Sequence, residues 1–284
     1  MGRMCGNCKT DISHRHKLAR FCSDKCRDAP QFRGTYCLWC GKELIVAATH
    51  KKTIKHCSRA CSHKTLYKKD NQNFNEDYFS IPNLKNSYWA GFIAADGCVL
   101  TPDVGQRRLQ ISLKSTDGEH LILLKSAVGA GIIREYSHGI AFRATRITVV
   151  SNKICQDLEE MFKITPRKSL TLNPPNLTGD LAHAFIAGYI DGDGCYKRSG
   201  NRPTVMIRGT FAMLSWIAGV YGLDKQPKID NGIYAISFHG DDALRVRDSF
   251  LGLGLPLMDR KINKWEEFSL NLKTLNRKKR KEIK

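Results

Sequence analysis

Residues 89–97 read WAGFIAADG, and a close copy, IAGYIDGDG, occupies residues 186–194. In both copies small residues recur about one turn apart within an apolar run, a pattern typical of helices whose backbones approach closely. Each run ends in Asp-Gly, and glycine suits the left-handed position just past a helix C-terminus. The repeat predicts two similar halves whose leading helices pack side by side, with Asp96 beside Asp193.

Asp96 and Asp193 would meet an unfavourable electrostatic environment in this arrangement. The C-terminal end of a helix carries partial negative charge, and two neighbouring carboxylates repel each other. A cation between the two side chains would remove the repulsion, so the pair indicates a cation site. The alternative without a chemical function is a buried helix hairpin in which each Asp-Gly only ends its helix.

Both stretches resemble the LAGLIDADG motif of homing endonucleases, and the resemblance covers roughly residues 78–272. It implies an α+β fold in which an αββαββα unit is duplicated about a pseudo-two-fold axis. The first half is then expected at residues 88–176 and the second at residues 177–272.

The resemblance also implies roles for the acidic residues. In that family the last acidic residue of the motif binds divalent metal at the active site. This role maps onto Asp96 and Asp193, which are expected to hold Mg²⁺ together with the carbonyl oxygens of Ala95 and Gly192. The motif's other acidic position is Asp191 in the second copy but alanine in the first, so no catalytic role is assigned to Asp191.

Both halves close on an Arg-Lys pair that ends in Lys168 or in Lys261. In the family, a lysine near each active centre is thought to assist catalysis, which implies a catalytic role for both residues. Such a cation can stabilise charge that develops on the phosphate, or orient a water molecule. The alternative is that each is a solvated surface lysine.

Several segments of the core alternate between apolar and polar residues, which is typical of half-buried strands. Their polar faces could merely face water. In the family, however, such strands form a saddle over the major groove of DNA, where arginine and glutamine can read base edges. The residues expected to contact DNA are Arg108, Gln110, Ser112, Lys114, Arg143, Thr145, Arg202, Thr204 and Arg208.

Most of the cysteines lie near the N-terminus, in two modules expected at residues 1–33 and 34–69. Each module has a Cys-x2-Cys pair followed by a Cys-x3-Cys pair, and a serine stands where a helix could begin. Four thiolates suit a closed tetrahedral zinc site, which would staple a segment too short to fold alone. The modules resemble treble-clef-like zinc fingers, with redox-active pairs and disulfides as alternatives. The expected zinc ligands are Cys5, Cys8, Cys22, Cys26, Cys37, Cys40, Cys57 and Cys61.

The net charge of +19 is concentrated at the two ends of the chain. Residues 1–69 and a tail at residues 273–284 hold most of the excess lysine and arginine, which indicates a polyanionic partner. Residues 70–87 read as a linker in which Tyr78, Phe79 and Ile81 are apolar enough to dock on the core. No apolar run approaches the roughly 20 residues that span a bilayer, and no signal peptide is recognisable, so an intracellular protein is expected.

The resemblance therefore predicts a monomeric, site-specific endonuclease, a mobile-element enzyme of intron homing. It would use Mg²⁺ to hydrolyse phosphodiester bonds in both strands of a long double-stranded DNA target, with the zinc fingers adding DNA contacts. The alternative class is a binding protein: an RNA-splicing maturase, or a DNA-binding regulator that does not cleave. Loss of a motif aspartate would favour the alternative, and both aspartates are present.

Overall fold

The computed structural model describes residues 2–28, 32–37, 40–47, 55–62, 73–138, 142–199 and 202–264. The chain divides into two compact units, residues 1–71 and residues 72–284. The basic tail expected at residues 273–284 lies outside the described residues. Within the described ranges, no helix is both long enough and apolar enough to cross a membrane.

The described residues of the smaller unit form short elements of regular structure. These elements are a short helix and a two-stranded antiparallel sheet, and a further helical turn occupies residues 59–62. The elements are α1 (Asp24–Asp28), β1 (Phe32–Tyr36) and β2 (Glu43–Ala47).

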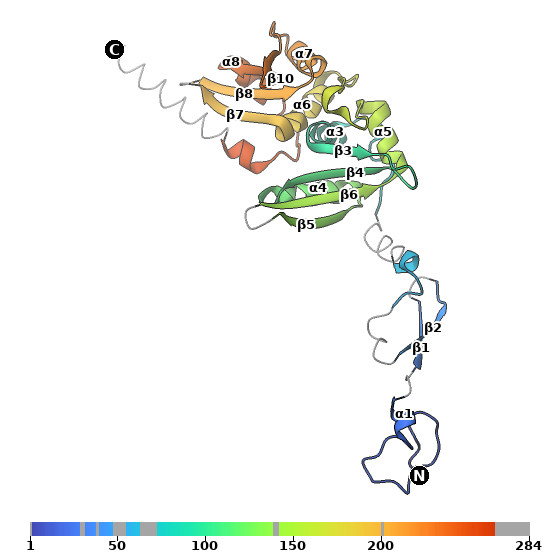
Figure 1. Ribbon diagram of the computed structural model, residues 1–284. Coiled ribbons are helices and arrows are strands. Elements are labelled where there is room, and N and C mark those ends of the chain that lie inside the picture. The colour runs from blue at the N-terminus through green and yellow to red at the C-terminus, as the bar shows by residue number, and fades with distance from the viewer. Residues whose placement is uncertain are drawn as a thin grey trace, which may run out of the picture. The chain divides into compact units, whose positions relative to one another are not determined.

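The larger unit contains the same arrangement twice (Figure 1). In each half a central helix leads directly into a four-stranded antiparallel sheet. The first half comprises α3 (Leu84–Asp96), β3 (Gly97–Leu100), β4 (Arg108–Lys114), η2 (Ser115–Asp117), α4 (Gly118–Val128), β5 (Ile132–His138), β6 (Phe142–Val150), α5 (Asn152–Phe162) and η3 (Lys168–Leu170). The second comprises α6 (Gly179–Asp193), β7 (Gly194–Ser199), β8 (Arg202–Gly209), α7 (Phe211–Val220), β9 (Lys228–Asp230), β10 (Ile233–His239) and α8 (Asp241–Asp248).

The two sheets have matching strand orders, β3-β4-β6-β5 in the first half and β7-β8-β10-β9 in the second. Each order places the first two strands as a hairpin beside the last two. The duplicated α+β architecture expected from the sequence repeat is therefore confirmed.

The central helices α3 and α6 cross at their glycines. A Cβ atom added to Gly91 would lie 1.8 Å from the backbone oxygen of Phe185, and one added to Gly188 would lie 1.9 Å from the backbone oxygen of Tyr88. At each glycine, the main chain of the other helix thus occupies the space that a side chain would fill. Close approach of this kind is the reason that small residues recur at these positions.

The segment before α3 docks on the core from residue 73 onward. Phe79 is fully buried, and its ring packs edge-on against Phe162 of α5, with the ring centroids 6.0 Å apart. The side-chain amide of Asn86 donates to the carbonyl oxygens of Tyr78 and Ile81, both at 2.8 Å. Ile81 itself is 76% exposed, so the expectation that its side chain docks is wrong. The amide of Asn86 holds this backbone in place.

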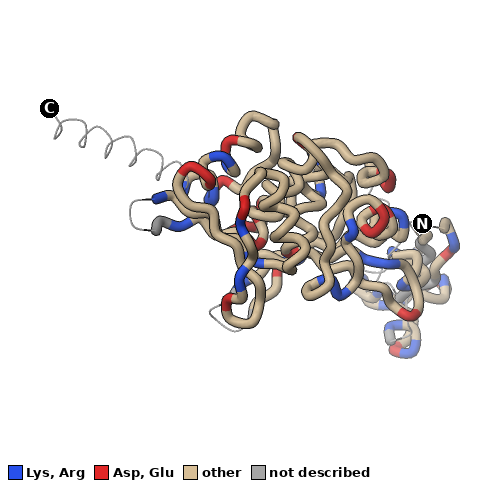
Figure 2. The backbone as a smooth tube through the Cα atoms, turned by 90° about the horizontal axis from the view of Figure 1, so that it is seen from above, with Lys and Arg blue, Asp and Glu red and all other residues tan. Residues whose placement is uncertain are grey.

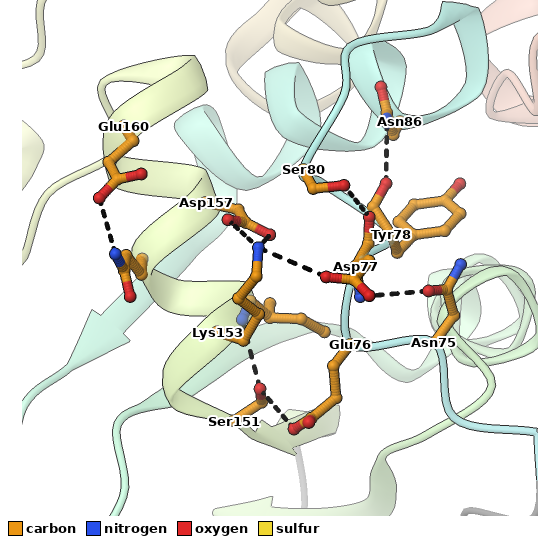
Figure 3. Close-up of polar contacts among 12 residues, drawn as sticks. Asn75, Glu76, Asp77, Tyr78, Ser80, Asn86, Ser151, Lys153, Asp157 and Glu160 are labelled. Carbon is orange, nitrogen blue, oxygen red and sulfur yellow. Dashed lines mark hydrogen bonds and ion pairs between the residues drawn. The ribbon is translucent and has the colours of Figure 1, made fainter.

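Polar contacts attach the same segment to α5 (Figure 3). Lys153 lies between two carboxylates, 3.5 Å from Asp77 and 2.5 Å from Asp157. The hydroxyl of Ser151 donates to Glu76 at 2.9 Å. Asp157 is almost fully buried, so Lys153 supplies the positive charge that a carboxylate needs there. These contacts orient the entry to α3.

The glycine crossing yields a stability prediction. Gly188→Ala should lower the free energy of unfolding of the core by on the order of 3 kcal/mol, because the added methyl group overpacks a backbone contact. Gly219→Ala, in α7, is the matched control because an added Cβ there meets nothing within 4 Å. It should raise stability by up to about 1 kcal/mol through helix propensity. Urea unfolding followed by tryptophan fluorescence measures both, and equal effects would contradict the packing argument.

Candidate active site and cysteine clusters

Asp96 and Asp193 are the last residues of α3 and α6, and each is followed by a glycine that starts a strand. Gly97 and Gly194 have extended backbones, with φ of −85° and −81°, so the expected left-handed position is wrong. Glycine is required here by space. A Cβ atom on Gly194 would lie 2.4 Å from the carbonyl oxygen of Ile190, and the corresponding contact at Gly97 would be similarly short.

The two carboxylates are brought together by small residues at the ends of the helices. A Cβ atom added to Gly192 would lie 2.3 Å from the Cβ atom of Ala95 and 3.4 Å from Oδ2 of Asp96. Desolvation by the surrounding protein and, next, the charge of Asp96 raise the pKa of Asp193 to about 6. Desolvation also raises the pKa of Asp96, against the opposing charges of Lys261 and Lys168. The pair therefore has the repulsion that favours a bound cation.

Lys261 caps the end of α6. Its Nζ atom lies within 3.2 Å of four backbone oxygens, those of Ile190, Asp191, Gly192 and Gly194, among which its three N–H groups are shared. An ammonium group at this point complements the negative end of the helix dipole. Burial nevertheless lowers the pKa of Lys261 to about 8.

Lys168, in η3, has a much looser setting. Among the described residues, its Nζ atom donates one hydrogen bond, of 3.4 Å, to the carbonyl oxygen of Ala95. Burial lowers the pKa of Lys168 as well, and the charge of Asp193 opposes that shift. The two lysines occupy equivalent places near the carboxylates, yet only Lys261 is fixed by several backbone acceptors. Since a carbonyl oxygen has two lone pairs, the lysine contacts leave Ala95 and Gly192 able to bind a metal ion.

The polar face of β4 is open, as the alternation predicted. Arg108, Ser112 and Lys114 are exposed, and Gln110 is half-buried. Some of these side chains are pre-ordered by their neighbours: Gln110 donates to Thr148 at 3.3 Å, and the hydroxyl of Ser112 accepts from Arg146 at 2.7 Å.

The prediction for the neighbouring strand β6 was wrong in its choice of face. Thr145 is buried, and its hydroxyl oxygen lies 2.9 Å from a Cβ atom built on Gly118. Arg143 alternates with Thr145 and so belongs to the same, core-facing side, although it lies at the exposed end of the strand. The open face of β6 instead carries Arg146 and Thr148, which are the cross-strand neighbours of Ser112 and Gln110 on β4. The guanidinium of Arg146 also lies over the ring of Tyr136, 4.7 Å from its centroid.

On the open face of the second sheet, polar side chains contact one another more than they do in the first sheet. Arg202 is exposed, but Thr204 is fully buried, and its hydroxyl lies 2.9 Å from Nδ1 of His239. Arg208 forms an ion pair of 2.7 Å with Asp230 of β9. Thr204 therefore lies on the open face of the sheet, as predicted, but it is covered there and is not exposed to solvent. Figure 2 shows basic and acidic positions interspersed along the backbone of the core.

Comparison with known proteins gives a structural match only. No protein-family profile and no curated protein matches this sequence. Among solved structures, the LAGLIDADG meganuclease I-AabMI bound to uncleaved DNA superposes with a TM-score of 0.50 at 13% identity, over 69% of this chain and 92% of that one. The core has the LAGLIDADG fold.

Two other solved structures are similar at a slightly lower level. The meganuclease I-SmaMI bound to uncleaveable DNA gives a TM-score of 0.49 at 13% identity, over 66% of this chain and 90% of that one. The LAGLIDADG homing endonuclease I-GzeII in complex with its DNA target gives 0.47 at 12% identity, over 70% of this chain and 92% of that one.

Within the LAGLIDADG core, the structure gives Asp191 a role that sequence reasoning missed. The side chain is buried, and its Oδ2 atom accepts from the hydroxyl of Tyr88 at 2.7 Å and from the backbone N–H of Met258 at 2.9 Å. The Tyr88 hydroxyl also lies 3.0 Å from Nε2 of His120. Asp191 thus joins α6 to α3 and to the segment that carries Lys261. The sequence does contain a signal for this contact, because both partners are replaced together in the other copy of the motif. The first copy has alanine at the position of Asp191, and the second has phenylalanine at the position of Tyr88.

The eight N-terminal cysteines form two groups of four, and in each group the sulfur atoms lie within 4.8 Å of one another. Measured pairs include Cys8 and Cys22 at 3.4 Å and Cys40 and Cys57 at 3.5 Å. Four sulfurs held tetrahedrally by zinc at its usual bond length would be roughly 3.8 Å apart, so the spacing fits. The groups are Cys5, Cys8, Cys22 and Cys26, and Cys37, Cys40, Cys57 and Cys61.

Serine side chains fix the last cysteine of each group. The hydroxyl of Ser23 accepts from the backbone N–H of Cys26 at 3.2 Å, and Ser58 accepts from that of Cys61 at 3.1 Å. Both are N-caps of short helices, as the sequence predicted. Each group therefore draws its final ligand from a capped helical turn.

The unequal lysine contacts yield a prediction about stability. Lys261→Met should lower the free energy of unfolding of the core by about 2 kcal/mol, because several buried carbonyl oxygens lose a charged donor. Lys168→Met removes one long hydrogen bond and should cost less than about 1 kcal/mol. Urea unfolding of the two variants measures the difference, and an equal or reversed order would contradict the assignment of Lys261 as a helix cap.

Proposed function

We propose that this chain is a site-specific DNA endonuclease of the homing type, which makes a metal-dependent double-strand cut in a long DNA target. The observation that carries the proposal is the pairing of Asp96 and Asp193 where α3 and α6 end, within a LAGLIDADG fold. A carboxylate from each half at one point suits a reaction on two strands. Because both halves belong to one chain, the proposed active form is a monomer.

The proposed chemistry is hydrolysis of a phosphodiester in each strand. Bound Mg²⁺ would supply an activated water and stabilise charge on the phosphate. Asp96 and Asp193 would supply the carboxylate ligands, and Ala95 and Gly192, which precede them in the chain, would add their carbonyl oxygens. The ammonium of Lys168, buried beside the same carboxylates, would stabilise charge on the phosphate, because one long hydrogen bond to the carbonyl oxygen of Ala95 leaves it other donors.

Lys261 has a different proposed part in the reaction. Its contacts with backbone oxygens hold the end of α6, so it fixes the position of Asp193. We therefore assign Lys168 to direct contact with DNA and Lys261 to positioning.

The proposed DNA-reading surface is the open face of the two sheets. In the first half it consists of Arg108, Gln110, Ser112 and Lys114, with Arg146 and Thr148 in place of Arg143 and Thr145. In the second half Arg202 and Arg208 remain. Thr204 is buried and is proposed only to position His239, to which it is hydrogen-bonded. Arginine and glutamine present the donor geometry that discriminates guanine and adenine in the major groove.

The cysteine clusters are proposed to hold one structural zinc ion each. The four sulfurs of each cluster lie together, and a segment as short as each finger buries too little surface to fold without such a staple. The basic residues of this unit would then bind DNA phosphates beside the site that the core recognises. Residues 1–33 and 34–69 are the proposed fingers, 70–87 the join, 88–176 and 177–272 the two repeats, and 273–284 a basic tail.

The second candidate function is an RNA-splicing maturase or a non-cleaving regulator. Both use the same fold for binding, but neither requires the paired carboxylates. The placing of Asp96 and Asp193 together at the ends of α3 and α6 favours cleavage, since a binding protein gains nothing from two neighbouring like charges.

The carboxylate pair yields the main test. Asp193→Asn should slow cleavage of a target, selected from a randomised DNA library, by at least about 10³-fold. Binding should change little, because the asparagine keeps the shape of the side chain. Asp180→Asn, an exposed change on the same helix, is the control and should cut normally. Single-turnover cleavage and gel-shift binding measure the two effects; wild-type cutting by Asp193→Asn would exclude this active site.

The cysteine clusters yield a second test. Protein purified under reducing conditions without chelator should contain two zinc ions per chain, and removing them should unfold residues 1–61 while the core stays folded. Elemental analysis and limited proteolysis measure these outcomes. A metal-free protein whose N-terminal unit resists proteolysis would show that the cysteines do not form zinc sites.

A further inference from the structure

A cavity of about 460 Å³ lies beside Asp96, on the open side of the first sheet. Its walls combine the end of α3 with β4, η2 and the segment that precedes Lys261. Most of its lining is polar, and it includes two basic side chains. The polar residues that line it are Asp96, Ser112, Lys114, Thr116, Asp117 and Arg260.

Arg260 is held in this cavity through the Nε atom of its guanidinium. Its Nε atom donates to both carboxylate oxygens of Asp117, at 2.9 Å each. Asp117 is 13% exposed, whereas the side chain of Arg260 is 56% exposed. Since Asp117 belongs to the first half and Arg260 to the second, the ion pair also spans the two halves. A guanidinium anchored through Nε keeps a fixed plane and direction.

The remaining donors of Arg260 have no acceptor among the described residues. In the part of the chain that the structure describes, its two terminal nitrogens have no hydrogen-bond partner, and their four N–H groups are available. Lys114 and the hydroxyl of Thr116 add donors to the same cavity, and Lys114 is exposed. A rigid guanidinium with two free nitrogens matches two oxygens of a phosphate group.

The equivalent place in the other half lacks this arrangement. Arg167, the counterpart of Arg260, is exposed and has a left-handed backbone with φ of 56°. The N-cap position that Asp117 occupies before α4 is taken by Thr210 before α7, and the Thr210 hydroxyl donates to the carbonyl oxygen of Leu172 at 2.6 Å. No carboxylate stands at that cap to orient Arg167.

We propose that Arg260, oriented by Asp117, binds a backbone phosphate of DNA beside Asp96, and that this phosphate subsite exists in one half of the core only. This inference rests on the proposed nuclease function, because DNA is the substrate that would bring a phosphate to this cavity. Arg260 and Asp96 line the same cavity, which places the guanidinium at the edge of the proposed reaction centre. The consequence is that the two strands are held unequally.

The test compares Arg260→Gln with Arg167→Gln, its matched control. With calcium in place of magnesium, Arg260→Gln should bind the selected target roughly tenfold more weakly. The slope of log affinity against log salt should flatten by about 0.9. With magnesium, one strand should be cut more slowly than the other, so that a nicked product accumulates. Arg167→Gln should match the wild type in all three measurements.

A phosphate-by-phosphate probe locates the contact. Replacing single phosphates near the cut by uncharged methylphosphonates should identify a position that weakens wild-type binding but leaves binding by Arg260→Gln unchanged. Asp117→Asn should weaken binding less than Arg260→Gln, and the double variant should equal Arg260→Gln alone. Arg260→Lys, which keeps the charge, guards against a folding defect and should recover part of the affinity.

The outcomes separate this inference from the function beneath it. If wild-type protein cuts its target and Arg260→Gln matches Arg167→Gln in affinity, salt slope and strand preference, the phosphate subsite is wrong. If wild-type protein binds DNA but never cuts, the nuclease proposal fails, while the methylphosphonate result still decides whether Arg260 contacts a phosphate.

Discussion

The backbone contact between α3 and α6 is the constraint on which the rest of the core depends. Gly91 and Gly188 let each helix enter the space where the other would carry side chains. That depth of approach brings the two C-termini together, and with them Asp96 and Asp193. The sheets then diverge from the same point, because each helix continues into a strand at once. Packing, the position of the carboxylates and the placing of two open sheet faces therefore follow from one crossing.

Local sequence patterns were enough for much of this architecture but not for all of it. The repeated apolar run, the alternation in β4 and the cysteine spacing each report a periodicity that needs no distant partner. On β6 the pattern was ambiguous, because polar residues occupy both faces: Arg143 and Thr145 on one, Arg146 and Thr148 on the other. The hydroxyl of Thr145 is small enough to be buried beside Gly118, so its polarity misled the assignment.

The chemistry at the helix ends depends on contacts that no local pattern encodes. Lys261 meets backbone oxygens some seventy residues earlier, and Asp191 meets a tyrosine still further away. Pseudo-symmetry even obscured the difference between Lys168 and Lys261, since the two Arg-Lys pairs are identical in sequence. Their environments diverge because of what each ammonium finds nearby: one long contact in one half, a set of short ones in the other.

The hydrogen bond between Tyr88 and Asp191 restricts how the halves can be recombined. Its donor comes from one half and its acceptor from the other, and the symmetry-related pair is apolar. Two copies of the first half would place Tyr88 against alanine in place of a carboxylate, and two copies of the second would bury Asp191 without its tyrosine donor. After duplication the halves have become complementary and are no longer interchangeable, so a chimaera must inherit both partners of the bond or neither.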